Sequence, residues 1–260
     1  EEEGHDEERI LKADEVIKSP GIPEKAALIK HLRAASVPII SEIEFAYRYT
    51  KAKIIAISGS NGKTTTTMLC NHIFSKAKLD VGMAGNVGES MAAMIAEGEK
   101  EYLILELSSY QLDDIIDFKP DIAVLLNITP DHLDRYEYDF QKYVNSKMQI
   151  VKNQTEEDIF IYNFDDEVIG EEIRKRNCPS KLYPISLNTE VDPGAYLKNE
   201  TIIFNNKQLF EILLISENFS FVYKHMFVNN EKLITRIIRK VFFLKLPNNK
   251  VNKSFLTMNN

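Results

Sequence analysis

The sequence contains few cysteines, no long apolar run and no excess of positive charge. Its two cysteines, Cys70 and Cys178, lie far apart and belong to no C-x-x-C motif or Cys/His cluster, so we expect neither a disulfide framework nor a structural zinc site. Neither an 18-residue apolar run nor a signal peptide is present, which gives no support for membrane insertion or export and makes the cytoplasm the expected location. The net charge of −7 argues against a general nucleic-acid binder.

Both ends of the chain are unusual in composition. Residues 213–260 contain no glycine, alanine or aspartate and carry a net charge of +6, against −13 for residues 1–212. This break predicts a divergent tail, and we hypothesise that it is translated out of frame or is otherwise unrelated to the preceding residues. The chain opens at Glu1, without methionine, in an acidic segment, so we expect a fragment whose beginning is missing.

The rest of the chain has the composition of an ordinary globular protein. With 260 residues, 44% of them apolar, it can bury a core in one or two domains. From Lys51 onward, apolar runs that predict strands alternate with amphipathic patterns that predict helices. The strands are Ile54–Ile57, Val81–Ala84, Tyr102–Leu107, Ile122–Leu126 and Ile159–Tyr162, and the helices are Thr64–Lys76, Glu89–Ala96 and Asp139–Lys152. Strands this apolar are buried on both faces, which predicts an α/β fold with a mostly parallel sheet of the phosphate-loop type, flanked by helices.

Residues 1–50 predict a smaller, partial α/β domain. Its expected elements are a helix at Glu7–Lys12, a strand at Val16–Ile17, a helix at Glu24–Ala35 and a strand that begins at Pro38. A Pro/Gly turn at residues 19–23 would place the first strand at a sheet edge.

A glycine-flanked loop follows the first strand of the larger sheet. Gly59 and Gly62 let the backbone turn tightly and direct N–H groups at phosphate oxygens, Lys63 adds a point charge, and Thr64 can place a hydroxyl on Mg2+. The full G-x-x-x-x-G-K-[ST] pattern would have glycine at position 57, where this chain has Ile57, so the loop is a variant. The alternative is a simple glycine turn, but we predict a nucleotide site formed by Gly59, Ser60, Asn61, Gly62, Lys63, Thr64 and Thr65.

Polar residues follow two further strands, and in such sheets ligands bind at the carboxyl ends of the strands. Glu106 ends one strand and is a candidate Mg2+ ligand beside Thr64; its alternative role is that of a solvated carboxylate at a strand end. His132 follows the next strand in the polar segment 127–136. A lone histidine is more often structural, but its place at the same sheet edge favours a function.

Lys147 lies on an apolar helix face, because Phe140, Tyr143, Val144 and Val151 recur with it at helical spacing. Burial of an ammonium group is costly. The pattern slightly favours snorkelling, in which the stem is buried and the head reaches water; the alternative is a lysine with a depressed pKa that is open to covalent modification.

Two further polar segments follow predicted strands. Met83-Ala-Gly-Asn-Val-Gly88 is suited to close approach of a substrate backbone. Asn163-Phe-Asp-Asp166 could contact a ribose or form an Asx-type turn, and the pattern favours the turn.

Four segments together resemble the Mur ligases of peptidoglycan synthesis, in order and spacing as well as in residues. They are Ser58-Gly-Ser-Asn-Gly-Lys-Thr-Thr65, Gly85-Asn-Val-Gly88, Leu105-Glu-Leu-Ser-Ser-Tyr-Gln-Leu112 and Asn127-Ile-Thr-Pro-Asp-His-Leu-Asp-Arg-Tyr136. The third segment, with Ser19-Pro-Gly-Ile22, is most similar to the members that add D-glutamate.

The resemblance implies an ATP-dependent amide ligase. In such enzymes the substrate carboxylate takes the γ-phosphate of ATP, and an amine then attacks the acyl phosphate. The implied substrates are UDP-N-acetylmuramoyl-L-alanine and D-glutamate, the implied cofactors are ATP and Mg2+, and we expect a monomer.

The resemblance also implies residue roles. Lys63, His132 and Lys147 would be catalytic, and Thr64 and Glu106 would hold one Mg2+. His132 would help to hold a second Mg2+. Lys147 matches a family lysine that is carbamylated by CO2 and becomes an anionic ligand of the metal site.

Three residues match positions that the family uses around the muramoyl substrate: Asn86, Ser108 and Gln111. The resemblance covers about residues 5–212. It implies a remnant of the UDP-substrate-binding domain at 1–50, an ATP-binding central domain at 51–212, and a divergent tail at 213–260 in place of the C-terminal amino-acid-binding domain.

We therefore expect a ligase core that is impaired in completing the reaction. One alternative is a nucleotide-binding remnant without catalysis. Another is a related folylpolyglutamate or cyanophycin synthetase, against which the segment Ser108-Ser-Tyr-Gln111 stands.

Overall fold

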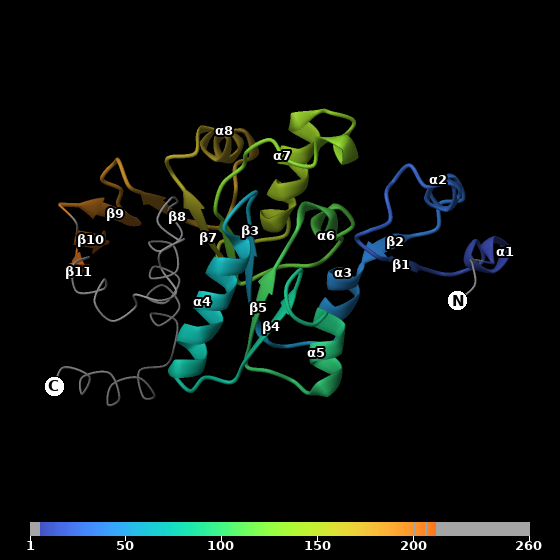
Figure 1. Cartoon of the computed structure of the whole chain (residues 1–260), viewed down its shortest axis with the longest axis horizontal. Helices are drawn as coiled ribbons and strands as arrows, with labels where there is room; N and C mark the ends of the chain where they lie inside the picture. The colour runs from blue at the N-terminus through green and yellow to red at the C-terminus, as the bar shows by residue number, and fades with distance from the viewer. Residues whose placement is uncertain (1–5, 200, 206, 212–260) are drawn as a thin grey trace.

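The computed structural model describes residues 6–199, 201–205 and 207–211. Its elements are shown in Figure 1. The helices are α1 (Glu7–Ile10), α2 (Ala27–Ala34), α3 (Glu42–Tyr47), α4 (Lys63–Lys76), α5 (Met91–Glu97), α6 (Ser109–Asp113), α7 (Phe140–Met148) and α8 (Glu167–Arg176), with 3-10 turns η1 (Leu133–Tyr136) and η2 (Gln149–Val151). The strands are β1 (Val16–Lys18), β2 (Ile39–Ser41), β3 (Lys53–Ser58), β4 (Val81–Gly85), β5 (Tyr102–Glu106), β6 (Ile122–Leu125), β7 (Ile159–Asn163), β8 (Lys181–Ser186), β9 (Ala195–Lys198), β10 (Thr201–Phe204) and β11 (Lys207–Glu211).

Nine of the described strands form one sheet in the order β11-β10-β9-β8-β7-β6-β3-β5-β4. Neighbours from β4 to β9 are parallel, and β10 and β11 continue the sheet as antiparallel strands. The predicted α/β fold with a mostly parallel sheet is confirmed. Since β3 has β5 on one side and β6 on the other, the loops that follow these three strands meet at one edge of the sheet.

The strands are buried on both faces because successive side chains point to opposite sides. In β3, Ile54 and Ala56 face a core with α3, α5, α6, α7 and α8, whereas Ile55 and Ile57 face a second core with α4. Helices thus cover both faces (Figure 1), and two apolar layers hold the central strands rigidly in place.

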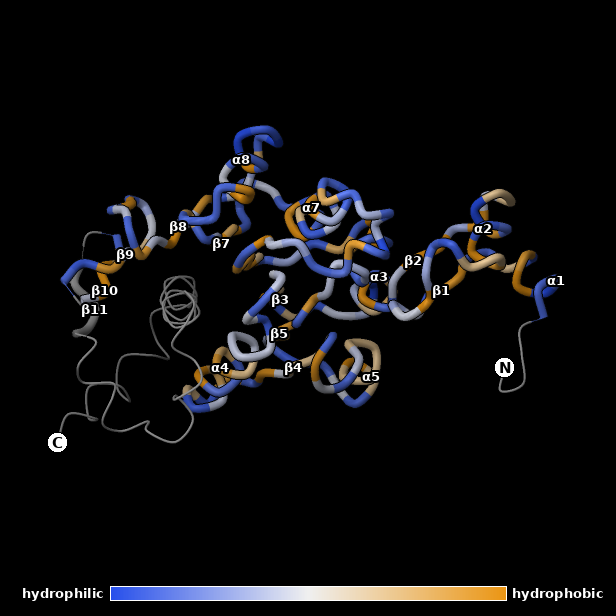
Figure 2. The backbone as a smooth tube through the Cα atoms, turned by 45° about the horizontal axis from the view of Figure 1, so that its top comes forward, coloured by the Kyte–Doolittle hydropathy of each residue, from blue (hydrophilic) through white to orange (hydrophobic). Residues whose placement is uncertain are grey.

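Residues 6–41 form a smaller unit beside the sheet. Strands β1 and β2 pair in parallel, with Ile17 opposite Ile40, and α2 packs Ile29 and Leu32 into a separate small core. Figure 2 shows this unit at the opposite end of the molecule from β9, β10 and β11.

The predictions for the larger sheet are accurate to a few residues, but several elements were not predicted. The omitted elements are α3, α6, α8, η1 and β8 to β11. The helix expected at Asp139–Lys152 is interrupted: Asp139 is the N-cap of α7, which ends at Met148, and the chain continues as η2. The tail predicted at 213–260 lies outside the described residues. No helix in the described part of the chain is long and apolar enough to cross a membrane.

Candidate functional site

The loop between β3 and α4 has the backbone of an anion site. Gly62 takes a left-handed conformation (φ 84°) as the N-cap of α4 and supplies no side-chain cap. The first N–H groups of a helix have no partner within the helix, and together with the helix dipole they favour an anion at this end. Gly59, with φ 156°, lies so close to Leu126, the residue after β6, that an added Cβ would stand 3.0 Å from Leu126 Cβ.

The loop is fixed to the segment that follows β6. Asn61 N donates to Asn127 Oδ1 (2.8 Å), and Asn127 Nδ2 donates back to Asn61 O (3.1 Å). Ser60 Oγ donates to Thr129 O and accepts from Thr129 N, both at 2.9 Å. Tyr143 Oη of α7 also lies 2.9 Å from Ser60 Oγ. These bonds fix the shape of the loop.

Two lysines share one carbonyl of this loop. Lys63 Nζ donates to Gly59 O (2.8 Å) and Ser60 O (2.9 Å), and Lys147 Nζ donates to the same Gly59 O (2.8 Å). Burial lowers the pKa of Lys63, and the carboxylates of Glu106 and Asp131 oppose that shift. The site therefore places two lysine amines beside the uncapped helix end.

Lys147 does not snorkel, so the prediction that the sequence pattern favoured is wrong. Only 2% of its surface is exposed, and its Nζ lies 4.8 Å from the centre of the Tyr143 ring. Burial, reinforced by the nearby charge of Lys63, lowers the pKa of Lys147 to about 7. The head group stays inside because it donates a hydrogen bond to the carbonyl oxygen of Gly59, 88 residues away in sequence. The other reading, a lysine with a depressed pKa, agrees with these contacts.

Glu106 presents a buried carboxylate at the end of β5. Its Oε1 accepts from Asn86 Nδ2 at 2.8 Å, whereas its Oε2 is buried and has no hydrogen-bond partner among the described residues. An unpartnered carboxylate oxygen in the interior is costly unless a cation or donor satisfies it. Carboxylate, hydroxyl, water and phosphate oxygens are the ligands of Mg2+, so Glu106 fits the predicted metal role.

Thr64 and His132 make fewer contacts with the loop and with Glu106 than the two lysines and Asn86 do. Thr64 lies exposed in the first turn of α4. The His132 Nε2 lies 3.5 Å from the Asp131 carboxylate, and its ring lies 5.7 Å from that of Tyr110. The described residues contain no group of three His, Cys, Asp or Glu side chains that could hold a metal ion. The remaining ligands of a Mg2+ held by Glu106 would therefore be groups of other kinds, such as the Thr64 hydroxyl, water or phosphate oxygens.

Ser108 and Gln111, predicted to surround the substrate, form a capping box at the start of α6. Gln111 Oε1 accepts from Ser108 N (3.1 Å), and Ser108 Oγ accepts from Gln111 N (3.4 Å). The box fixes α6 directly after Glu106. Their contact with a substrate stays a prediction.

Three contributors to the site had no individual role predicted from the sequence. Asn127 and Tyr143 hold the loop, and the charge of Asp131 acts on both Lys63 and Lys147. Position after a central strand could have identified Asn127 and Asp131, but the partner of the Tyr143 hydroxyl is set only by tertiary packing.

The segment after β7 forms a turn, as predicted. Asp165 N donates to Asn163 Oδ1 (3.0 Å), and Asp166 caps α8 through Ile169 N while it accepts from Ile128 N (2.8 Å). This turn also supports the loop after β6.

Comparison with known proteins gives clear relatives. Residues 57–226 match the Mur ligase middle domain family. The UDP-N-acetylmuramoylalanine--D-glutamate ligase of Bacteroides fragilis is 53% identical over 212 residues, which cover 81% of this chain and 48% of that protein. The protein of the same description from Cytophaga hutchinsonii is 46% identical over 227 residues, 86% of this chain and 50% of that protein. The chain thus spans about half the length of these curated relatives.

A solved structure shares the fold at low identity. UDP-N-acetylmuramate:L-alanyl-gamma-D-glutamyl-meso-diaminopimelate ligase from Neisseria meningitides superposes with a TM-score of 0.54 and 16% identity. The match covers 79% of this chain and 70% of that one.

Proposed function

The chain belongs to the Mur ligase family, and on this premise we propose that it carries the ATP- and Mg2+-binding core of a ligase that joins D-glutamate to UDP-N-acetylmuramoyl-L-alanine. The relatives named above support the substrates. The site residues support the chemistry.

The observation that carries the proposal is the unpartnered Oε2 of Glu106 beside the loop of Lys63. The uncapped N-terminus of α4 would receive the phosphates of ATP, with Gly59 to Thr65 around them. Thr64 and Glu106 would hold one Mg2+ and His132 would contribute to a second. When bound, Mg2+ would neutralise charge on phosphate oxygens.

The protein's own part in the reaction is to position and to stabilise charge. The carboxylate of the UDP-linked substrate would attack the γ-phosphorus of ATP, so that one P–O bond forms as the bond to ADP breaks. Lys63 would exchange its two carbonyl acceptors for phosphate oxygens and so stabilise the transferring group. The amine of D-glutamate would then displace phosphate and form the amide.

Lys147 is suited to carbamylation. Its neutral amine would add to the carbon of CO2, form an N–C bond and release a proton, which gives an anionic carbamate. A pKa near 7 leaves a large share of the amine neutral at neutral pH. The carbamate would be a ligand of the metal site.

The remaining assignments follow the same family pattern. We propose that Asn86, Ser108 and Gln111 face the muramoyl group. We also propose that residues 1–50, which include the N-terminal unit, belong to the UDP-substrate domain, and that the ATP-binding domain begins at residue 51.

Isothermal titration with a non-hydrolysable ATP analogue, with and without Mg2+, tests the proposal. We expect Mg2+-dependent binding that Lys63→Ala weakens by about tenfold or more, because the variant loses a charged phosphate contact. Lys76→Ala, at the exposed far end of the same helix, is the matched control and should leave the affinity unchanged.

A coupled assay of ADP release with both substrates runs beside the titration. Binding without turnover would assign the chain to nucleotide binding alone. Equal affinities of wild type and Lys63→Ala would refute the phosphate site.

A further inference from the structure

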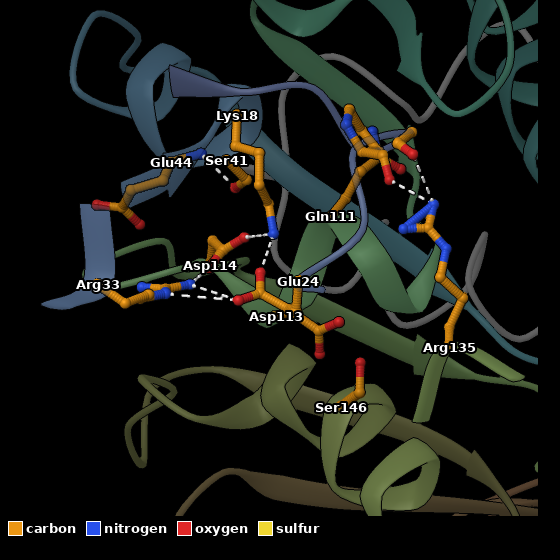
Figure 3. A network of polar contacts seen from close by, with 12 residues as sticks. Lys18, Glu24, Arg33, Ser41, Glu44, Gln111, Asp113, Asp114, Arg135 and Ser146 are labelled. Carbon is orange, nitrogen blue, oxygen red and sulfur yellow. Dashed lines mark hydrogen bonds and ion pairs between the residues drawn. The ribbon is translucent and has the colours of Figure 1, made fainter. Parts of the chain in front are cut away.

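Arg135 joins the loop that follows β6 to the N-terminal unit. Its Nη2 donates to Pro20 O and to Gly21 O, both at 3.0 Å. These carbonyls belong to a turn that Ile22 N closes on Ser19 O (3.0 Å). Figure 3 shows the guanidinium reaching across to this turn from a different side than the lysine and arginine that bind Asp114.

The guanidinium is held in place from the other side by an aromatic stack. Its central carbon lies 4.2 Å from the centre of the Tyr110 ring, and Tyr110 stacks on Tyr136 at 6.1 Å and 17°. The His132 ring borders the same Tyr110 ring at 5.7 Å. A planar guanidinium can stack and donate at once, which a lysine ammonium does less well. One side chain therefore contacts both the turn and the aromatic ring beside His132.

A second attachment lies at the opposite end of α6. Asp114, the C-cap of α6, is buried and pairs with Lys18 Nζ (2.7 Å) and Arg33 Nη2 (2.5 Å) of the N-terminal unit. These two contacts attach the strand β1 and the helix α2 of the unit to the C-terminal end of α6. Arg135 instead contacts the turn at residues 19–22, so the two attachments hold the unit at separate points.

We propose that Arg135 is a positioning residue. It fixes the turn at residues 19–22 against the His132 loop, so that a substrate carried by the N-terminal unit meets the phosphate loop in one orientation. This inference rests on the proposed function for the meaning of that orientation, but the mechanical link can be tested without it. Small displacements of bound reactants have large effects on rate, which is the reason for such a link.

Hydrogen–deuterium exchange of the 260-residue chain tests the link. In Arg135→Ala we expect the amides of residues 17–24 to exchange about tenfold faster, because two hydrogen bonds that hold the turn are lost. Arg135→Lys, which keeps a donor and the charge, should be intermediate. Arg48→Ala is the control, since Arg48 also binds the N-terminal unit, through both oxygens of Glu15, but does not contact this turn.

If Arg135 only stabilised the fold, its loss would also change amide exchange in the central strands and nucleotide affinity. In Arg135→Ala the amides of β3 and β5 should keep their exchange rates, and the Kd of the Mg2+-bound ATP analogue should stay within about twofold. In the ADP-release assay the KM for UDP-N-acetylmuramoyl-L-alanine should rise about tenfold while that for ATP stays unchanged.

Three results overturn the inference: unchanged exchange at residues 17–24, faster exchange throughout the central strands, or a loss of nucleotide affinity in Arg135→Ala. Failure of the wild type to bind nucleotide would instead refute the proposed function, and exchange at residues 17–24 would still decide whether the link exists.

Discussion

The carbonyl oxygen of Gly59 brings two functional lysines together, because the ammonium groups of Lys63 and Lys147 both donate to it. Two cations at one carbonyl repel each other, and Lys147 cannot reach water. The structure therefore keeps a group whose charge is costly in the folded state. Such an arrangement is typical of functional sites, where stability is lower than it could be.

Lys147 should make stability depend on pH. Its pKa is about 7 in the folded chain, against an ordinary value of 10.5 for lysine. Between these two pH values the unfolded chain binds the proton that the folded chain has lost, so stability rises with pH. Lys147→Met removes this cost. Its stability advantage over wild type should shrink by about 2 to 3 kcal/mol from about pH 6 to pH 9, measured by urea denaturation in CO2-free buffer.

Lys76→Met serves as the control for this series, because Lys76 is exposed at the end of α4. It should show no such trend. A pH-independent difference between Lys147→Met and wild type would contradict the buried-ammonium account.

Single residues were predictable where sequence position alone fixes their surroundings. Lys63, Glu106 and His132 follow apolar strands, and the parallel sheet brings those strand ends to one edge. The position of the Lys147 amine was not predictable in the same way. The sequence correctly placed Lys147 on the apolar face of its helix. Whether its amine snorkels depends on a nearby acceptor, however, and Gly59 O is a backbone atom that no side-chain pattern reveals.

At the scale of elements, the parallel pairing of β4 with β5 places Asn86 beside Glu106. Asn86 N donates to Glu106 O (2.8 Å), and the two side chains bond as well. Gly85 permits this approach: its φ is 106°, and an added Cβ would stand 2.3 Å from Glu106 O. Backbone atoms cannot yield cheaply, so glycine is required here.

Gly85→Ala should destabilise the fold by about 2 kcal/mol or more, through strain at positive φ and the clash with Glu106 O. Thermal or urea denaturation measures this. Gly170→Ala is the control: Gly170 lies in α8, and its Cβ would meet only Arg174 Nη1 at 3.5 Å. That change should be neutral or stabilising by up to about 1 kcal/mol. Equal stabilities of the two variants would contradict the close approach.

The apolar central strands and the helix α4 were predictable from the sequence, whereas the short helices α3 and α6 were not. The strands β3, β5, β6 and β7 are short apolar runs bounded by turn residues, and α4 follows directly after the glycine loop. The helix α6 has five residues and depends on the capping box, while α3 is fixed by Ser41, which caps it through Glu44 N. Such short helices are set by caps and tertiary packing rather than by periodicity.

At the scale of the whole molecule, the N-terminal unit is attached to the sheet domain through buried charge. Asp114 and Lys18 are both buried, at 6% exposure each, and they lie 2.7 Å apart. Removal of one partner of a buried pair leaves the other uncompensated. The order of expected elements and the family resemblance predicted a separate N-terminal unit, but neither reveals a contact between residues 96 positions apart in sequence.

Asp114→Asn should therefore destabilise the chain by about 3 kcal/mol and loosen residues 6–41 first. Chemical denaturation, followed by exchange of the amides of β1 and β2, measures both effects. Asp80→Asn, which breaks the exposed pair with Lys100 (3.0 Å), is the control and should cost less than about 1 kcal/mol. Similar costs for the two variants would show that the buried pair does not hold the unit.

The central claim is that Glu106 and Thr64 hold a metal ion at a nucleotide phosphate site. A crystal structure of the chain with a non-hydrolysable ATP analogue and Mn2+ in place of Mg2+ tests it most directly, since Mn2+ gives an anomalous signal. We predict an anomalous peak between Glu106 Oε2, Thr64 Oγ1 and the phosphates, with Lys63 withdrawn from Gly59 O. A metal peak elsewhere, or Glu106 Oε2 still unpartnered with nucleotide bound, would contradict the account.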